Sequence, residues 1–420
     1  MKKLVSLALF LGFQGLYPEP VMASGQFIAD EAKSHMIDQL ASAYSLERGQ
    51  LISAELVKKL TIKDILANPK LERALSNRQL VPKNGIQVFN VTFQTKSPKA
   101  PIVASGVILV PDPMPSEAPV ISLQHGTLPD KSSAPSKSPY EGLFEASLGF
   151  VTLVQDYIGY GVTENLMHPY IIAESYADTG VDFLKASQEF ANLHHLHLGK
   201  LFLKGYSEGG YATLALQREL ETHYADAFPI EASAPSAGPF QLEILSEILL
   251  AKERINPFLI PYVLLSYNDW FPDDNLNLDD IFRVKTEKMQ RLFNGNYSGK
   301  YIYISLPKQT NQLFDPEFSS DFLLFDSTLP SSIALKKVLT EQSINGSNWS
   351  PRSKTRFYHC LDDEVIPLTS LLNILKEFKG NPNISEPVIY TTKPDETPYT
   401  HITCPGLYDP TLEFLRMLKL

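Results

Sequence analysis

The chain has 420 residues, of which 44% are apolar and 20% are charged, and its formal net charge is −10. This is an ordinary globular composition, sufficient for a large hydrophobic core. The acidic balance argues against nucleic acid as a partner and against binding to anionic lipid by charge alone. The length allows two or three domains, and the sequence contains no internal repeat and no low-complexity tract.

The first 23 residues have the three regions of a cleavable export signal. Lys2 and Lys3 precede an apolar run over residues 4–16, and small residues lie near Ala23, where we expect cleavage. The run is short for a membrane span; a buried N-terminal helix or a retained anchor is the alternative. Cleavage removes a charge of +1 and leaves 420 − 23 = 397 residues with a net charge of −11. No later stretch is long and apolar enough to cross a bilayer, so we expect a periplasmic or secreted protein.

Residues 24–84 are expected to form an N-terminal helical extension, with residues 41–43 and 51–57 as its clearest segments. From residue 85 the pattern changes. Residues 86–93 alternate between apolar and polar, and residues 103–110 form a second β-rich run that ends in prolines. The pair predicts two antiparallel strands.

The following apolar runs are continuous and are separated by helical patterns. They cover residues 119–123, 150–154, 201–203, 230–234, 356–358 and 388–390. Unbroken apolar strands that alternate with helices are typical of a mostly parallel sheet covered by helices on both faces. The sequence therefore predicts the α/β class.

A G-x-S-x-G segment follows the apolar run at 201–203. Residues 205–209 read G-Y-S-E-G, and an amphipathic helical pattern comes after them. A sharp turn lifts a serine hydroxyl clear of its neighbours, and such a turn tolerates little beyond glycine at its flanks. The helix would aim its N-terminal N–H groups at the serine. Ser207 is therefore the candidate nucleophile, with a capping serine in a glycine-rich turn as the alternative.

The chain after Ser207 is longer than a minimal fold requires. From Ser207 to the acidic segment at Asp363 it runs 156 residues, whereas the intervening helices and strands need on the order of 50. The excess is helical and rich in aromatic residues, and predicts a cap over residues 240–350 inserted after the sixth strand. The core is then divided into residues 85–239 and 351–420. The alternative is that these aromatic residues form only the core of a helical subdomain.

A serine nucleophile needs a base, an acid that orients the base, and N–H donors for the oxyanion. Among nine histidines, His401 alone follows the acidic cluster at residues 362–364, and it lies just past the run at 388–390. In α/β-hydrolases the order along the chain is serine, acid, histidine. His401 is therefore the candidate base, and a surface histidine is the alternative.

Residues 359–367 read H-C-L-D-D-E-V-I-P and resemble the segment H-G-x-x-D-x-V-V-P that α/β-hydrolases often carry. The resemblance implies that Asp363 is the acid. Cys360 stands where the pattern has glycine. Asp362 is the alternative acid, and Glu364 is interpreted as a solvated loop charge.

Residues 125–127, which read H-G-T, resemble the HG-x motif of lipases and esterases. That resemblance implies that the backbone N–H groups of Thr127 and Glu208 bind the oxyanion and that His125 is structural. Residues 156–161 and 168–170 resemble segments of fungal secretory lipases and their bacterial relatives, a likeness that extends loosely from residue 85 to the C-terminus. These segments are interpreted as pocket wall and loop braces.

His194, His195 and His197 invite a metal hypothesis. No matching acidic or cysteine set accompanies them, so a surface loop is the favoured interpretation. No metal and no cofactor is expected.

The two cysteines, Cys360 and Cys404, are expected to form a disulfide. Each lies three residues from a candidate site residue, Asp363 or His401, and those two residues must touch. An exported chain with an even cysteine count meets an oxidising compartment. Two buried free thiols are the alternative.

These features predict an exported serine hydrolase that cleaves a small-molecule or lipid ester, a lipase or esterase with a helical cap. A serine peptidase is the first alternative, since G-x-S-x-G-G-Y also resembles prolyl-oligopeptidase-like enzymes, but no β-propeller repeat precedes the motif. A compact aminopeptidase is a second alternative. A non-catalytic binding module on the same fold is a further alternative, although no triad member is missing.

Overall fold

The computed structural model describes residues 46–419 except 275, 393–397 and 407–409. The expected export signal, residues 1–23, lies outside the described residues, as does the expected helical segment at 41–43. Among the helices of the described ranges, none has both the length and the apolar character that crossing a membrane requires.

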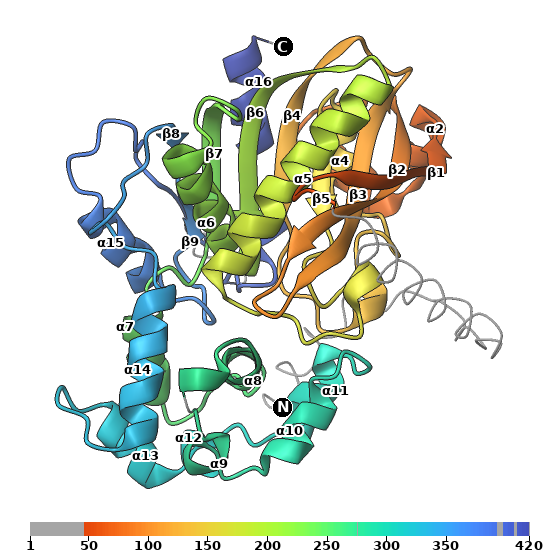
Figure 1. The fold of residues 1–420 in the computed structure, drawn as a ribbon. Helices are drawn as coiled ribbons and strands as arrows, with labels where there is room; N and C mark the ends of the chain where they lie inside the picture. The colour runs from red at the N-terminus through yellow and green to blue at the C-terminus, as the bar shows by residue number, and fades with distance from the viewer. Residues whose placement is uncertain (1–45, 275, 393–397, 407–409, 420) are drawn as a thin grey trace, which may run out of the picture.

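A ten-stranded sheet forms the centre of the fold (Figure 1), with strand order β1-β2-β3-β5-β4-β6-β7-β9-β10 and β8 paired to β7. The strands are β1 Leu51–Leu60, β2 Gly85–Lys96, β3 Pro101–Asp112, β4 Glu117–Gln124, β5 Val151–Gln155, β6 His197–Tyr206, β7 Ile230–Ser236, β8 Lys354–Thr355, β9 Tyr358–Cys360 and β10 Val388–Tyr390. The pairs β1–β2, β2–β3 and β3–β5 are antiparallel, and the remaining pairs are parallel. The predicted α/β class with a mostly parallel sheet is confirmed.

Helices cover both faces of this sheet. They are α2 Ile62–Ala67, α3 Pro69–Ser76, α4 Leu143–Ser147, α5 Ala173–Leu193, α6 Glu208–His223, α15 Leu368–Glu377 and α16 Pro410–Leu418. Successive residues of one strand point to opposite faces: Phe202 of β6 packs in the cluster that holds α3, α4 and α16, whereas Leu201 and Leu203 pack against α5 and α6. Each strand thus contributes to two cores, which explains its continuous apolar sequence.

The predicted helix at residues 51–57 is wrong, because these residues belong to strand β1. β1 runs antiparallel to β2, from Leu51 opposite Phe93 to Leu60 opposite Ile86. Most of its side chains are exposed, so hydrogen bonding to the open edge of β2 selects the strand conformation, and that partner is invisible to local sequence patterns. The helices α2 and α3 do lie within the expected extension.

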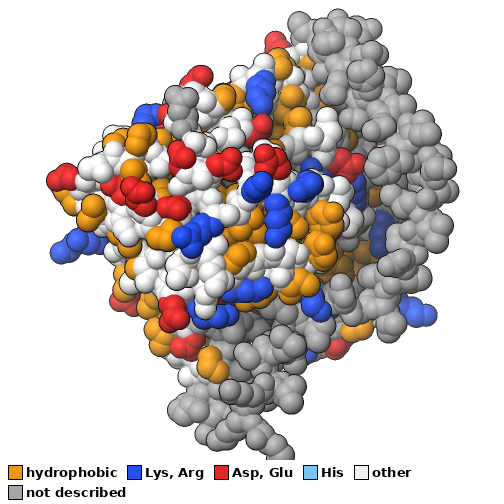
Figure 2. Space-filling view, turned by 90° about the horizontal axis from the view of Figure 1, so that it is seen from below, with side chains coloured by type: hydrophobic (Ala, Val, Ile, Leu, Met, Phe, Trp, Pro, Cys, Tyr) orange, Lys and Arg blue, Asp and Glu red, His pale blue; other side chains and the backbone are white. Residues whose placement is uncertain are grey.

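The described residues between β7 and β8 include the α-helices α7 Leu242–Leu250, α8 Leu259–Trp270, α9 Leu278–Ile281, α10 Thr286–Leu292, α11 Gly299–Ser305, α12 Thr310–Leu313, α13 Pro316–Phe322 and α14 Pro330–Gln342. In Figure 1 they gather below the sheet. Most aromatic residues of this helical insertion are buried in one cluster with residues of the sheet domain such as Tyr170 and Tyr176. Figure 2, seen from below, shows apolar side chains interspersed with Lys, Arg, Asp and Glu on this face.

Candidate active site

Ser207 occupies a sharp turn between β6 and α6, with φ 60° and ψ −123°. Glycines make this turn possible, because a Cβ atom at Gly205, Gly209 or Gly210 would meet a backbone carbonyl oxygen at 2.0–2.2 Å. Those oxygens belong to Gly209, to Gln124 of β4 and to Ser236 of β7. The N-terminus of α6 therefore packs closely against β4 and β7, the strands on either side of β6. Ser207 is held in a conformation that non-glycine residues rarely adopt.

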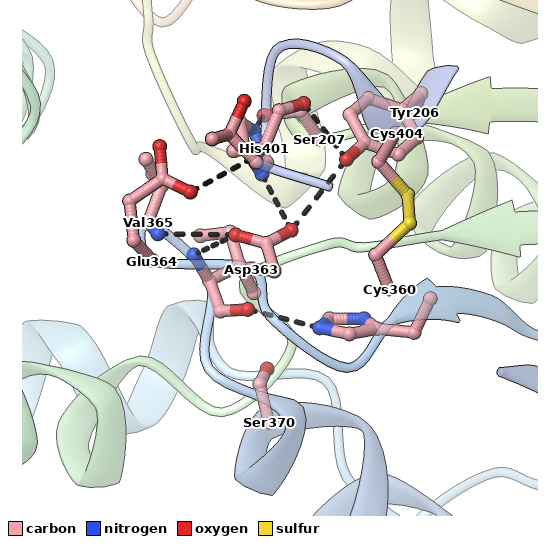
Figure 3. Close-up of polar contacts among 12 residues, drawn as sticks. Tyr206, Ser207, Cys360, Asp363, Glu364, Val365, Ser370, His401 and Cys404 are labelled. Carbon is pink, nitrogen blue, oxygen red and sulfur yellow. Dashed lines mark hydrogen bonds and ion pairs between the residues drawn. A yellow bond between two sulfur atoms is a disulfide. The ribbon is translucent and has the colours of Figure 1, made fainter. Parts of the chain in front are cut away.

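The three residues predicted as a triad lie together (Figure 3). His401 Nε2 is 2.7 Å from Ser207 Oγ, and His401 Nδ1 is 2.7 Å from Asp363 Oδ2. The other oxygen of Asp363, Oδ1, accepts hydrogen bonds from the N–H groups of Val365 (3.0 Å) and Ile366 (2.8 Å). An Nδ1–H donor to the carboxylate leaves Nε2 as the acceptor for the serine hydroxyl. The geometry suits proton transfer from Ser207 to His401.

Each of the three consecutive acids contacts the segment around His401 in a different way. Asp363 binds the imidazole, whereas the carboxylate of Asp362 accepts a hydrogen bond from Thr392 Oγ1 at 2.7 Å and does not reach the ring. Glu364, interpreted from the sequence as a solvated charge, accepts the backbone N–H of His401 at 2.9 Å. Of the three acids, Asp363 is the one bonded to the imidazole of His401. Asp362 and Glu364 bind Thr392 and the backbone of His401.

Tyr206 is a site residue that sequence reasoning missed. Its hydroxyl donates to the carbonyl oxygen of His401 at 3.0 Å, and its ring packs on the imidazole with centroids 5.1 Å apart. The only signal in the sequence is its place beside Ser207.

The predicted disulfide between Cys360 and Cys404 is present, with a Cα–Cα distance of 6.1 Å. Both cysteines are buried. The bridge joins the end of β9, which leads to Asp363, to the residues that follow His401 (Figure 3). The cysteine at position 360, where the resembling motif has glycine, therefore serves this connection.

The H-G-T segment follows β4 and lies beside the serine. An added Cβ at Gly126 would be 4.0 Å from Ser207 Cβ. His125 is buried; its Nδ1 donates to the carbonyl oxygen of Gly126 at 2.8 Å, and its ring lies 4.0 Å from that of Tyr157. Thr127 Oγ1 is 2.8 Å from the hydroxyl of Tyr170. The segment is thus braced next to Ser207.

Asp156 lies beside His125 of the H-G-T segment. Its carboxylate is fully buried and accepts hydrogen bonds from Ser105 Oγ (2.5 Å) and the N–H of Ser136 (2.8 Å). Burial raises the pKa of this carboxyl, and the hydrogen bonds oppose that shift.

The side chain of Glu208, directly after Ser207, belongs to a buried polar cluster that the sequence did not reveal. Glu208 Oε1 lies 2.8 Å from His168 Nε2 and accepts from the hydroxyl of Tyr176 at 2.9 Å. His168 Nδ1 donates to the carbonyl oxygen of Ile158 at 2.7 Å. Both ring nitrogens of His168 therefore lie within hydrogen-bond distance of an oxygen atom. The loop at residue 168 is thereby fastened to the first turn of α6.

Helix α8 of the insertion is bonded to the same loop. Ser266 Oγ donates to the carbonyl oxygen of His168 at 2.7 Å, and the hydroxyl of Tyr267 donates to that of Ile171 at 3.0 Å. The rings of Tyr262 and Tyr170 stack, with centroids 4.6 Å apart. The insertion is therefore joined to the site by buried hydrogen bonds as well as apolar packing.

An apolar cavity lies between the insertion and the sheet domain. Tyr170 and Ile366 form its wall on the sheet side, and Ile366 follows Asp363 closely in the chain. The insertion contributes Leu242, Leu245, Leu249, Ile260, Phe314 and Phe318, among others. The lining suits an apolar ligand group.

The three clustered histidines lie away from this site. His194 ends α5 and packs on Phe190, with ring centroids 4.3 Å apart, and His197 begins β6. In the part of the chain that the structure describes, no three His, Cys, Asp or Glu side chains are grouped as metal ligands would be.

Solved structures with the same architecture include the rice cell wall degrading esterase LipA from Xanthomonas oryzae. It is 23% identical, the match covers 88% of this chain and 98% of that one, and the TM-score is 0.75. Candida antarctica lipase A is 18% identical over 89% of this chain and 82% of its own, with a TM-score of 0.61. At these identities the likeness shows the fold, which is the α/β-hydrolase fold. No family profile matches the sequence, and no curated protein matches it significantly.

The disulfide generates a prediction about stability. It closes a loop of 44 + 1 = 45 residues, for which the chain-entropy model gives about 4 kcal/mol. We expect reductant, or the double substitution Cys360→Ser and Cys404→Ser, to lower the free energy of unfolding in urea by up to that amount. Reductant should not change the free energy of unfolding of the double variant, which has no cysteine left to reduce. Recovery of both cysteines as free peptides from protein made in an oxidising compartment would contradict the bridge.

Proposed function

We propose that the protein is an exported serine hydrolase that cleaves carboxylic esters, in the manner of a lipase or esterase. The observation that carries the proposal is the continuous contact from Ser207 Oγ through His401 to the buried carboxylate of Asp363. The lipase and esterase among the solved structures with this fold support ester chemistry.

The proposed reaction proceeds through an acyl-enzyme. Ser207 Oγ attacks the ester carbonyl carbon while His401 Nε2 takes its proton, and the tetrahedral intermediate collapses as the imidazolium protonates the departing alcohol. Water then repeats the sequence and releases the acid. Asp363 holds the imidazole in its reactive orientation, and the two backbone N–H groups bound to Oδ1 hold the carboxylate in place.

The oxyanion is assigned to the backbone N–H groups of Thr127 and Glu208. The close approach of Gly126 to Ser207 supports the first donor, and the location of Glu208 in the first turn of α6 supports the second.

The helical insertion at residues 240–350 is proposed to act as a cap that binds the apolar part of the substrate. The apolar cavity between the insertion and Ile366 supports this role. The core then comprises residues 85–239 and 351–420, preceded by an extension at 24–84. Export by the segment 1–23 is supported by the disulfide, which forms in oxidising compartments.

Mechanism can be tested with a fluorophosphonate probe, which reacts with activated serines. We expect one labelled residue, Ser207, and no labelling in Ser207→Ala. The same substitution should lower hydrolysis of a nitrophenyl ester by about 10⁴-fold or more, because triad members act as a unit. Labelling at another serine, or undiminished turnover in the variant, would refute the assignment.

The identity of the acid is tested by two matched substitutions. Asp363→Asn removes the carboxylate that holds His401 Nδ1, so kcat should fall by about 10³–10⁴-fold. Asp362→Asn keeps an oxygen for Thr392 and should cost less than about 10-fold, since an exposed hydrogen bond contributes little. Comparison of kcat for the two purified variants decides; equal losses would place the acid elsewhere.

Substrate class separates the ester hydrolase from the serine peptidase. Because the cavity is lined by apolar side chains, nitrophenyl esters with aliphatic acyl chains should be cleaved at least about 100-fold faster, in kcat/KM, than amino-acyl or peptidyl nitroanilides. One purified sample should be assayed against both panels. Faster cleavage of any nitroanilide than of every ester would favour the peptidase.

A further inference from the structure

The side chain of Thr127 makes a hydrogen bond that is separate from the proposed role of its backbone N–H group. Its hydroxyl oxygen is 2.8 Å from the hydroxyl of Tyr170. Thr127 is partly exposed at the end of the H-G-T segment, whereas Tyr170 is only 4% exposed. A buried hydroxyl thus meets a hydroxyl at the edge of the site.

Hydrogen-bond requirements decide which of the two oxygens donates. A buried phenol must place its hydrogen on an acceptor, and Thr127 Oγ1 is the acceptor that the described residues offer to Tyr170. Burial, followed by the charge of Glu208, raises the pKa of Tyr170 well above its ordinary value, so the phenol keeps its proton. Tyr170 therefore donates and Thr127 Oγ1 accepts. The hydrogen of the threonine hydroxyl must then point in another direction.

The tyrosine is held firmly enough to impose this arrangement. Its ring stacks on Tyr262 of α8 at an interplanar angle of 15°. The hydroxyl of Tyr262 is 3.1 Å from that of Tyr160, which in turn donates to the carbonyl oxygen of Leu128 at 2.5 Å. Residues 127 and 128 are therefore each fixed by a tyrosine, one through a side chain and one through the backbone.

We propose that the Thr127 hydroxyl is a third donor to the oxyanion and that Tyr170 is the positioning residue that orients it. Tyr170 donates to Thr127 Oγ1, and Thr127 donates its own hydrogen to the substrate oxygen that becomes negative when Ser207 adds to the carbonyl. This inference rests on the proposed ester hydrolysis. A preorganised donor costs no reorganisation during the reaction, and removing one commonly lowers kcat by about 10²–10³-fold.

Three single variants test the proposal. Thr127→Val preserves shape and the backbone N–H but removes the hydroxyl, so kcat for a nitrophenyl ester should fall about 10²-fold with KM changed less than about 3-fold. Thr127→Ser keeps the hydroxyl and should retain kcat within about 5-fold. Tyr170→Phe keeps the stacked ring but releases the threonine hydroxyl, and should lose about 10-fold in kcat.

The double variant Thr127→Val with Tyr170→Phe distinguishes orientation from packing. Because Tyr170 acts through the threonine hydroxyl, the double variant should be no slower than Thr127→Val alone. A trifluoromethyl ketone, which forms a tetrahedral adduct with the serine, should bind Thr127→Val about 10²-fold more weakly and Thr127→Ser nearly as well as the parent protein.

The proposal is overturned if Thr127→Val retains kcat, if Thr127→Ser loses as much as Thr127→Val, or if the losses in the double variant multiply. Thermal unfolding of each variant serves as the folding control. Labelling of Ser207 by the fluorophosphonate separates the two levels: a labelled parent with an unaffected Thr127→Val rejects the third donor alone, whereas an unlabelled parent rejects the proposed function.

Discussion

The close approach of backbone to backbone around Ser207 is the constraint on which the site depends. Gly209 and Gly210 press the start of α6 against carbonyl groups of β4 and β7, where a single methyl group would overlap an oxygen at about 2 Å. This packing fixes the direction of Ser207 Oγ relative to the sheet. The segments with Thr127, Asp363 and His401 follow other strands of the same sheet, β4, β9 and β10, and reach Ser207 from there.

His401 illustrates how a residue outside any α-helix or strand can still be positioned. Its imidazole is bound by Asp363, its backbone N–H by Glu364 and its carbonyl oxygen by Tyr206. A disulfide at Cys404 anchors the residues that follow. In a helix or strand, backbone hydrogen bonds would hold such a residue. Here side chains from β6 and from the acidic loop hold both the backbone and the imidazole of His401.

The sequence singled out residues that the structure brings together, Ser207, Asp363 and His401, but not the residues that surround them. Ser207 could be identified because its turn requires glycines at fixed spacing, and that requirement is local. Three adjacent carboxylates have equal charge and similar reach, so only a resemblance separated Asp363 from Asp362. The pairing of His168 with Glu208 spans 40 residues and leaves no local pattern. β1 was mistaken for a helix for the same reason. Its partner strand β2 begins at residue 85, which is 85 − 60 = 25 residues after β1 ends, so the pairing leaves no local pattern in the sequence.

The buried tyrosines connect the helical insertion to the H-G-T segment at residues 125–127 and so restrict how the insertion can move. Displacing α8 would break the bonds from Ser266 to His168 and from Tyr267 to Ile171, and each buried polar group left without a partner costs about 1–3 kcal/mol. It would also separate Tyr262 from Tyr170 and release the threonine side chain that Tyr170 orients. These contacts fasten helix α8 to the loop at residues 168–171, so any motion of the insertion that keeps them must leave α8 in place.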